Sequence, residues 1–376
     1  MRTGVVAPSR SLLVAVLLGC LLLPTACTAD VGPEPAASAA GTPSRAAPTL
    51  AAPTLATMDE AIEDYVTSGD DSLDNITSVL VTVDGRTITE FYRGRGSADR
   101  PTHLWSVTKS YLSTLVGIAL AEGKLSDLDD PLRKLLPDHR DAMSRQVSGI
   151  TLRQLMTMTA GIPGDEVYAQ LPDTDLDTFL KLPLASKPGT EFRYSSASTE
   201  LVAAVLTEAV RQPLLDYARV KLFDPLGIKT EPAYTGTETF DPTAAFDRAE
   251  FAWARTTDGI FHGCCLMKLT GRDMQKLGQL YLQQGRWQGR QLVPASWVAL
   301  ATSPTEIAPD YGYLWWIGQT GRYDAYSAIG RYGQVIEVIP ELKAVVTVSS
   351  WSNPAAPLDA DLIVPMIRDV IVPRIR

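Results

Sequence analysis

The stretch His103-Leu-Trp-Ser106-Val-Thr-Lys109-Ser-Tyr-Leu112 decides how the rest of this chain is interpreted. It predicts a helix that begins just after Ser106. In a helix, residues i and i+3 share a face, so the Lys109 amine can lie beside the Ser106 hydroxyl. The helix N-terminus adds a positive potential and free N–H groups where an oxyanion would form. Taken alone, the four residues are more typical of an ordinary helix start than of an acylated serine.

Composition indicates a globular protein with a substantial core. The chain has 376 residues, of which 45% are hydrophobic, a net charge of −9 and a pI near 5.0. This length suits one large domain or two interleaved subdomains. Because the chain is acidic and has no tract of Lys and Arg, nucleic acid and anionic membrane surfaces are poor partners.

The N-terminus resembles an export signal. Two arginines precede the apolar stretch 12–23, and small residues lead to Cys27. We predict a lipoprotein signal peptide over residues 1–26 and lipidation of Cys27, which would place the protein on the outer face of the bacterial cytoplasmic membrane. Secretion without an anchor, an uncleaved anchor and a lipobox ending at Cys20 are the alternatives.

Residues 27–56 are rich in Ala, Pro, Thr and Ser, and they contain a tandem Ala-Pro-Thr-Leu-Ala repeat. Such a segment buries little apolar surface, so we predict an extended tether. The folded domain is expected to span residues 57–376.

Hydrophobic periodicity predicts strands at both ends of this domain and helices between them. Because the distant strands must meet in one sheet, the order implies an α+β fold: an antiparallel sheet flanked by terminal helices, a mainly helical subdomain, and a cleft between the two. The expected strands are 78–83, 87–92, 312–319, 323–329, 333–339 and 343–350, and the expected helices are 58–67, 107–122, 151–158, 174–181, 196–211, 212–222, 271–285, 295–302 and 358–372.

Tyr194 is a second candidate for chemistry, because it follows an exposed loop and begins a predicted helix. A phenol is a poor base at its ordinary pKa of about 10. Beside an ammonium group such as that of Lys109, phenolate becomes less costly, and the two groups can jointly take the serine proton. The alternative is a packed tyrosine whose hydroxyl is satisfied.

The remaining reactive residue types give no metal signal. Cys264 and Cys265 are expected to be small buried apolar residues, because adjacent cysteines rarely bridge each other. The three histidines are scattered, and there is no Cys-x-x-Cys pair. The sequence therefore predicts neither a metal nor another cofactor.

Several further stretches strengthen the interpretation of Ser106, and with them the chain resembles the serine beta-lactamase-related family of class C type, close to 6-aminohexanoate-dimer hydrolases and related esterases. Their order and spacing are more specific than any one of them. In chain order they are Ser106-Val-Thr-Lys109-Ser-Tyr-Leu, Ile118-Ala-Leu-Ala-Glu-Gly-Lys-Leu125 continuing to Asp129-Asp-Pro131, Ile150-Thr-Leu-Arg-Gln-Leu-Met-Thr-Met-Thr-Ala-Gly161, Pro188-Gly-Thr-Glu-Phe-Arg-Tyr194-Ser195, Arg272-Asp-Met-Gln-Lys-Leu-Gly-Gln-Leu-Tyr281, Tyr311-Gly-Tyr-Leu-Trp-Trp316 and Gly330-Arg-Tyr-Gly-Gln334.

The resemblance implies a beta-lactamase/transpeptidase-like fold and a hydrolase that works through an acyl-enzyme. Ser106 would attack an amide or ester carbonyl, with Lys109 and Tyr194 moving the proton. The backbone N–H groups of Ser106 and Arg331 would form the oxyanion hole. Ser196 and Gly330 would take the substrate-binding positions of the second and third motifs.

Two departures from the family pattern narrow this expectation. Ser196 stands where penicillin-recognising members have Asn, and the third motif is Ala328-Ile-Gly330, without the usual Lys or His. A beta-lactam carboxylate would lack its cation there, so we expect an esterase or amidase acting on a less anionic acyl group. Trp315 and Trp316 alternate on a predicted strand, so at most one of them faces the cleft.

Two other functions stay open at this point. The weakened second and third motifs are also compatible with an extracytoplasmic acyl-binding or sensor domain that has little turnover. A Ser–His–Asp hydrolase would need a histidine near a nucleophilic serine, and the sequence has no Gly-x-Ser-x-Gly elbow.

Overall fold

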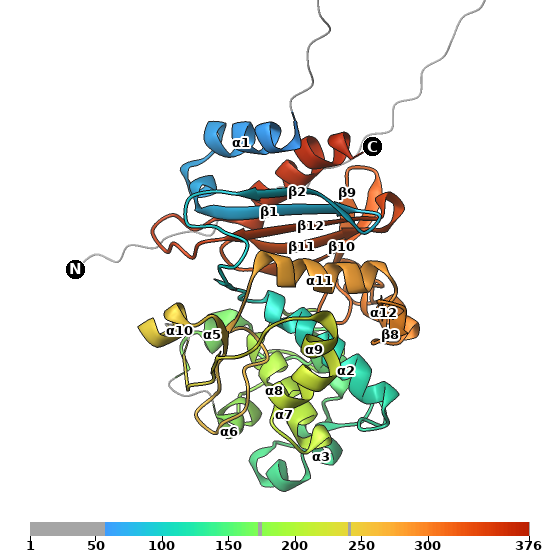
Figure 1. Ribbon diagram of the computed structural model, residues 1–376. Helices are drawn as coiled ribbons and strands as arrows, with labels where there is room; N and C mark the ends of the chain where they lie inside the picture. The colour runs from blue at the N-terminus through green and yellow to red at the C-terminus, as the bar shows by residue number, and fades with distance from the viewer. Residues whose placement is uncertain (1–56, 172–174, 240–241, 376) are drawn as a thin grey trace, which may run out of the picture. The chain divides into compact units, whose positions relative to one another are not determined.

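The computed structural model describes residues 57–171, 175–239 and 242–375, which belong to one compact unit, Leu55–Arg376. The predicted signal peptide, Cys27 and the tether lie outside these residues. None of the helices in the described ranges has the length and apolarity needed to span a bilayer. The helices are α1 Met58–Ser68, α2 Val107–Ala121, α3 Leu132–Leu135, α4 Leu152–Met156, α5 Asp165–Tyr168, α6 Leu176–Leu180, α7 Ser196–Val210, α8 Leu214–Ala218, α9 Asp224–Leu226, α10 Ala244–Arg248, α11 Gly271–Leu282, α12 Ala295–Ala301 and α13 Ala360–Pro365 (Figure 1).

A six-stranded sheet joins the two ends of the described chain, as expected for the α+β fold. Its order is β2-β1-β12-β11-β10-β9, and every neighbouring pair is antiparallel. The central pairing places Val79 opposite Val348 and Val81 opposite Val346, so apolar residues from both ends meet in the core. The strands are β1 Ile76–Val83, β2 Arg86–Tyr92, β9 Trp316–Thr320, β10 Tyr323–Gly330, β11 Gln334–Ile339 and β12 Ala344–Ser350.

Helices cover both faces of this sheet (Figure 1). Helix α1 and the C-terminal segment from α13 onward share a buried apolar cluster with one face, which includes Ile62, Ile363 and Ile367. Helix α11 packs against β11 and β12 on the other face. The terminal helices thus flank the sheet as the sequence predicts.

The mainly helical part is built around α2 and α7, which pack against each other. Helix α2 is buried from Val107 to Ala119, so it runs through the core rather than along the surface. Ser106 lies at the N-terminal end of this helix. The fold therefore holds the start of α2 rigidly, next to the sheet strand β10.

A second, smaller sheet was not anticipated. Its order is β3-β6-β5-β4, and β7 pairs with β8 in a separate hairpin. Strands of two or three residues show no usable alternation, so periodicity does not detect them. Their bounds are β3 Thr102–His103, β4 Ala233–Tyr234, β5 Phe251–Trp253, β6 Met267–Leu269, β7 Arg286–Trp287 and β8 Arg290–Gln291.

Most predicted elements differ from the structure only at their ends, but three differ in a way that has a clear structural reason. The strand expected from residue 312 begins at Trp316, because the Gly312 N–H donates to the Trp315 carbonyl in a turn and Leu314 has a φ of +63°. The helix expected over 212–222 passes from α8 into a π-helical turn at 219–223. The final helix begins at Ala360 and becomes π-helical after Pro365.

Candidate active site

Ser106 occupies a strained turn between β3 and α2. The preceding residue, Trp105, has a φ of +49°, which is uncommon for a bulky residue and is tolerated where the surroundings fix it. The Leu104 N–H donates to the Met267 carbonyl at 2.8 Å, and the Trp105 indole donates to the Ser352 hydroxyl at 2.8 Å. The turn therefore presents a half-buried Ser106 at the N-cap of α2, where its side chain makes no capping hydrogen bond.

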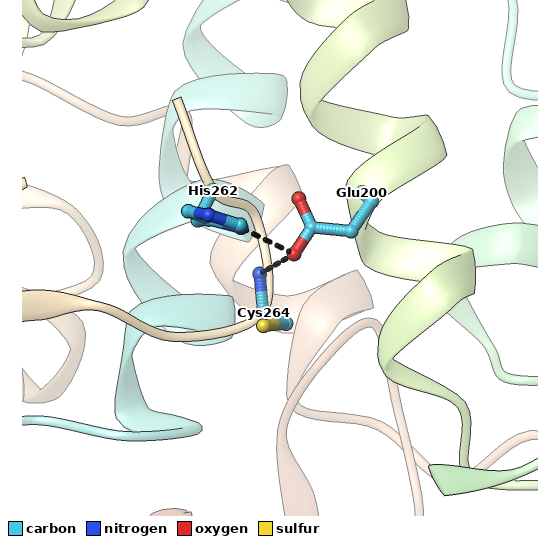
Figure 2. Close-up of side chains that lie close together, drawn as sticks. All are labelled: Glu200, His262 and Cys264. Atoms are coloured by element: carbon cyan, nitrogen blue, oxygen red, sulfur yellow. Dashed lines mark hydrogen bonds and ion pairs between the residues drawn. The ribbon is translucent and has the colours of Figure 1, made fainter. Parts of the chain in front are cut away.

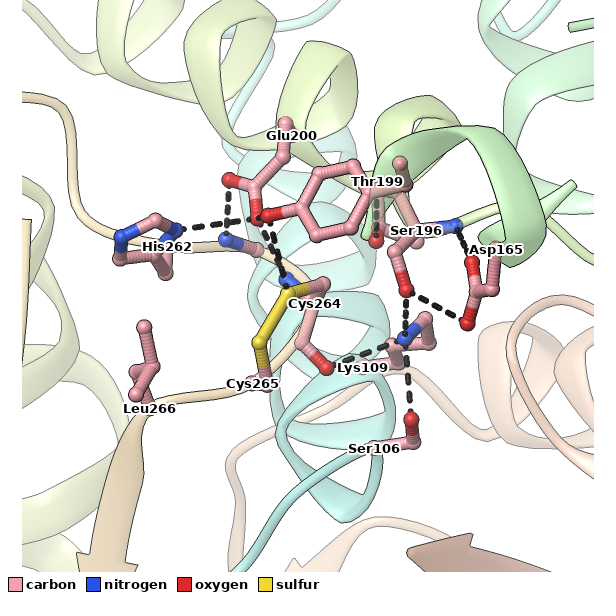
Figure 3. Close-up of a disulfide and its surroundings, with 12 residues drawn as sticks. Ser106, Lys109, Asp165, Ser196, Thr199, Glu200, His262, Cys264, Cys265 and Leu266 are labelled. Carbon is pink, nitrogen blue, oxygen red and sulfur yellow. Dashed lines mark hydrogen bonds and ion pairs between the residues drawn. A yellow bond between two sulfur atoms is a disulfide. The ribbon is translucent and has the colours of Figure 1, made fainter. Parts of the chain in front are cut away.

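Lys109 lies one helical turn further along, and its side chain is almost fully buried. Its Nζ atom donates to Ser106 Oγ at 3.1 Å, to Ser196 Oγ at 3.1 Å and to the Cys264 carbonyl at 3.0 Å (Figure 3). An ammonium has three N–H groups, and these three acceptors account for them. The contact between Ser106 and Lys109 predicted from their spacing is present.

The Ser196 hydroxyl links Lys109 to an acidic residue that the sequence did not single out. It accepts from Lys109 and donates to Asp165 Oδ2 at 3.1 Å, while the Ser196 N–H donates to Asp165 Oδ1 at 2.6 Å. Ser196 is buried, so its hydroxyl is committed to both neighbours. It holds the Lys109 ammonium in place.

Behind Lys109, a buried ion pair orients the peptide that supplies the third acceptor. The Glu200 carboxylate accepts from the N–H of Gly263 at 2.9 Å, and His262 Nδ1 donates to Glu200 at 3.1 Å (Figure 3). His262 Nε2 donates to the Glu238 carbonyl at 3.1 Å, so both ring nitrogens carry protons. The Glu200 charge thus anchors the segment whose next residue, Cys264, binds Lys109.

The charges of this pair stabilise each other. Burial works against the charged imidazolium, but the Glu200 carboxylate outweighs it and raises the pKa of His262 above its ordinary value. Burial also works against the Glu200 charge, yet the His262 charge and the hydrogen bonds from His262, Gly263 and Tyr168 lower the pKa of Glu200. The pair therefore favours the charged form of both residues in the folded protein.

Glu200, His262 and Cys264 are also close enough together to be considered as metal ligands (Figure 2). Both His262 nitrogens already donate hydrogen bonds, and Glu200 Oε1 also accepts from the Tyr168 hydroxyl at 2.9 Å. The Cys264 sulfur is bonded to Cys265. Because every donor atom has a partner within the protein, this cluster fits an internal hydrogen-bond network rather than a metal site.

The two cysteines correct one expectation. Both are buried as predicted, but they form a disulfide with each other (Figure 3). Adjacent side chains in a strand point in opposite directions, whereas residues 263–265 form a bend before β6. The bend brings the two sulfur atoms to the same side of the chain.

Tyr194 lies beside Lys109 through its ring. The Lys109 Nζ atom is 5.0 Å from the ring centroid, within the range of a cation–π contact. Trp316 stacks on Tyr194 with centroids 5.6 Å apart, and Tyr311 meets its edge at 6.2 Å. Within the described residues, the Tyr194 hydroxyl forms no hydrogen bond with Ser106 or Lys109.

The two tryptophans face different surroundings, as expected, although only Trp316 lies on β9. Trp315 is fully buried against Tyr281 and Tyr326, whereas Trp316 is half-buried and covers Tyr194. One of the pair therefore packs in the core, and the other joins the candidate active site.

Gly330 ends β10 in direct contact with the start of α2. A Cβ atom at this position would collide with the Leu104 carbonyl oxygen and come within 3.3 Å of the Ser106 nitrogen. Only glycine therefore lets β10 approach this closely. The peptide that follows, which carries the Arg331 N–H, leaves the strand beside Ser106. The Arg331 side chain extends over the rings of Trp105 and Tyr332.

The structure thus places Ser106, Lys109, Tyr194, Ser196 and Gly330 close together. Sequence reasoning missed Asp165, Glu200 and His262, which support these residues from behind. Asp165 is 31 residues from Ser196, and His262 is 62 residues from Glu200. No motif spacing signals such pairs.

The sequence of this chain is similar to those of known proteins. A family model described as Beta-lactamase matches residues 75–364. A 6-aminohexanoate-dimer hydrolase of Paenarthrobacter ureafaciens is 24% identical over 310 residues, covering 73% of this chain and 72% of the relative.

Two solved structures show the same fold at low sequence identity. A D-stereospecific amidohydrolase from a Streptomyces species superposes with a TM-score of 0.60 at 17% identity, covering 82% of this chain and 98% of its own. EstCE1, a hydrolase with promiscuous acyltransferase activity, gives a TM-score of 0.63 at 19% identity and covers 83% and 99% of the two chains.

Proposed function

Since the chain belongs to the beta-lactamase family, whose relatives and structural neighbours named above are hydrolases, we propose that it cleaves an amide or ester bond through an acyl-enzyme on Ser106. The observation that supports this most directly is the hydrogen bond from Lys109 Nζ to Ser106 Oγ at 3.1 Å. A serine in hydrogen-bond reach of a proton-transfer group, itself held by further partners, is the arrangement that nucleophilic catalysis requires.

Proton movement runs through Lys109 and Tyr194. For attack on the carbonyl, the Ser106 proton passes to this pair, with Tyr194 in its phenolate form or Lys109 in its neutral form as the acceptor. The same proton is then given to the nitrogen or oxygen of the leaving group. In the second half, a water molecule loses its proton to the pair and releases the acyl group from Ser106.

The developing negative charge on the carbonyl oxygen needs donors. The backbone N–H of Ser106 lies at the N-terminus of α2, where the helix dipole also favours an anion. The N–H of Arg331 is the second proposed donor, because Gly330 packs against the Ser106 backbone. Removing one such donor typically costs 10²- to 10³-fold in rate.

The scissile bond is an ester or an ordinary amide rather than the amide of a beta-lactam ring. Ala328, in the position of the usual third-motif cation, is buried and uncharged. The Ser196 hydroxyl, in the position of the usual Asn, is occupied by Lys109 and Asp165. The names of two relatives, a 6-aminohexanoate-dimer hydrolase and a D-stereospecific amidohydrolase, fit this choice.

Hydrolysis of 4-nitrophenyl butyrate by the purified full chain tests the proposal. Ser106→Ala is expected to reduce kcat by about a thousandfold or more while the thermal unfolding midpoint stays close to that of the wild type. Ser110→Ala is a matched control, because Ser110 lies on the same helix and donates to the Leu314 carbonyl instead. Equal turnover by Ser106→Ala and the wild type would refute the proposal. A stoichiometric acyl adduct that persists for hours would favour the acyl-binding alternative.

We also propose that the chain is exported and anchored through a lipid on Cys27. The support is the charged, apolar and small-residue order of residues 1–27. Labelling with a palmitate analogue in a bacterial host is expected to mark the wild type and not Cys27→Ser. Equal labelling of both chains would contradict the assignment.

A further inference from the structure

A cavity of about 500 Å³ lies beside the proposed oxyanion donors, the N–H groups of Ser106 and Arg331. Trp105, which precedes Ser106, and Arg331, which follows Gly330, both line it. Ser106 itself is not among the lining residues. The cavity therefore adjoins the catalytic serine without containing it, and no step proposed above uses it.

Positive charge is concentrated in this cavity. Arg95, Arg100, Lys268 and Arg331 line it, and Asp247 is the single acidic residue among the described residues that do so. The chain as a whole carries a net charge of −9. A cationic cavity in an acidic protein favours an anionic occupant.

The three arginines have no carboxylate partners. Within the part of the chain that the structure describes, the ion pairs formed by other arginines, such as Arg153 with Asp129, have no equivalent at Arg95, Arg100 or Arg331. The Arg100 guanidinium donates to the Arg95 carbonyl at 3.3 Å and to no carboxylate of the described residues. Their charge is thus available to a ligand.

Aromatic rings make cation–π contacts with two of these guanidinium groups. The Arg95 Cζ atom lies 4.5 Å from the Trp351 ring centroid, and the Arg331 Cζ atom lies 5.0 Å from that of Tyr332 and 5.7 Å from that of Trp105. A cation–π contact occupies none of the N–H groups at the edges of a guanidinium. Those edges match the two oxygens of a carboxylate.

The fourth cation, Lys268, adds charge to the cavity floor. Its Nζ atom donates to the carbonyl oxygens of Phe246, Asp247 and Ala249 at 2.6–3.2 Å. Burial lowers the pKa of Lys268 to about 8, so it keeps its proton at pH 7. His103, enclosed beside it, has a pKa of about 3 because of burial and the Lys268 charge, and it stays neutral.

We propose that this cavity binds a carboxylate carried by the substrate, held by Arg95, Arg100 and Arg331. The cavity explains why the third motif can lack a cation. Arg331, which follows Gly330, takes the place of the Lys or His that usually precedes this glycine. The proposal rests on the proposed hydrolysis at Ser106, and it replaces the expectation of a less anionic acyl group with a preference for acidic substrates.

Two 4-nitrophenyl esters of equal chain length test this preference at pH 7. The monoester of glutarate carries a terminal carboxylate, whereas the valerate ester is neutral. The ratio of kcat/KM for glutarate over valerate is expected to favour glutarate in the wild type. It is expected to fall about tenfold in Arg95→Gln and in Arg100→Gln, because each removes a charge-assisted hydrogen-bond partner. Arg322→Gln is the matched control, since Arg322 also stacks on an aromatic ring, Tyr323, but lies outside the cavity.

Each outcome either supports or overturns the proposed carboxylate site. A glutarate preference that both arginine variants lose and Arg322→Gln keeps supports the cavity. Turnover of the valerate ester without a glutarate preference, or with a preference that the variants retain, overturns it while leaving the proposed hydrolysis intact. If neither ester is turned over, the hydrolase proposal fails, and calorimetric titration with glutarate decides the cavity alone: binding weakened in the arginine variants supports it, and absent binding overturns it. Binding of inorganic phosphate but not of glutarate also overturns the carboxylate assignment.

Discussion

The Nζ atom of Lys109 donates a hydrogen bond to the carbonyl oxygen of Cys264 at 3.0 Å, across 155 residues of sequence. This contact joins the helix that carries the proposed nucleophile to the segment that precedes β6. With the Ser196 hydroxyl, it fixes the ammonium beside Ser106. The precision of the proposed proton transfer therefore depends on these partners as well as on Lys109 itself.

Ser196→Ala is expected to lower kcat by about 10- to 100-fold, because the Lys109 ammonium loses a buried hydrogen-bond partner worth about 1.5–3 kcal/mol. Steady-state hydrolysis of 4-nitrophenyl butyrate measures this loss. Ser195→Ala serves as the control, because Ser195 caps α7 through the Ser198 N–H and does not contact Lys109. It is expected to cost about 1 kcal/mol of stability with little change in kcat. An equal loss of kcat in both variants would contradict the role of Ser196.

Gly330→Ala is expected to lower kcat by about 100-fold, because a methyl group there collides with the Leu104 carbonyl and pushes β10 away from Ser106. Gly318→Ala is the control: Gly318 lies on the neighbouring strand β9, and a Cβ atom there would meet nothing within 4 Å. Activity of Gly330→Ala close to that of Gly318→Ala would argue against the proposed oxyanion geometry.

The contact between Ser106 and Lys109 could be predicted from the sequence because it depends only on the geometry of one helix. Ser106 and Lys109 are separated by one helical turn, and the long periodic segments that became α2, α7 and β10 were recognisable. The residues that support Lys109 from behind could not be predicted in this way. Asp165, Glu200 and Cys264 reach the site through tertiary packing, and their sequence separations carry no periodicity.

The length of an element likewise decided whether it could be predicted from the sequence. The six-stranded sheet followed from alternating strands of five to eight residues, whereas the strands of the second sheet, with two or three residues each, were missed. The bend at 263–265 lies beside that second sheet. Nothing in the sequence signals this bend, so the general rarity of bridges between adjacent cysteines led to the wrong expectation for Cys264 and Cys265.

Reduction of the Cys264–Cys265 disulfide is expected to lower activity several-fold, because it frees the segment whose carbonyl binds Lys109. Rates of ester hydrolysis before and after treatment with dithiothreitol measure the effect, and the mass of the peptide containing both cysteines confirms the reduction. A double Cys264→Ser/Cys265→Ser variant is expected not to respond to dithiothreitol. A response of equal size in that variant would assign the effect to another part of the protein.

The buried pair of Glu200 and His262 predicts a pH-dependent stability. Glu200→Gln is expected to cost about 3 kcal/mol near pH 5.5, because it leaves the buried His262 without its partner. The pKa of His262 is raised in the folded state, so its stabilisation is complete below the ordinary value of 6.5 and is lost as the pH rises through the folded value. The difference in unfolding free energy between the wild type and Glu200→Gln should therefore shrink between pH 5.5 and 8.5. Urea unfolding at both pH values measures it, with Glu63→Gln, a surface substitution, as the control that changes stability little at either pH. A difference that stays constant across this range would show that the pair does not exist as charged partners.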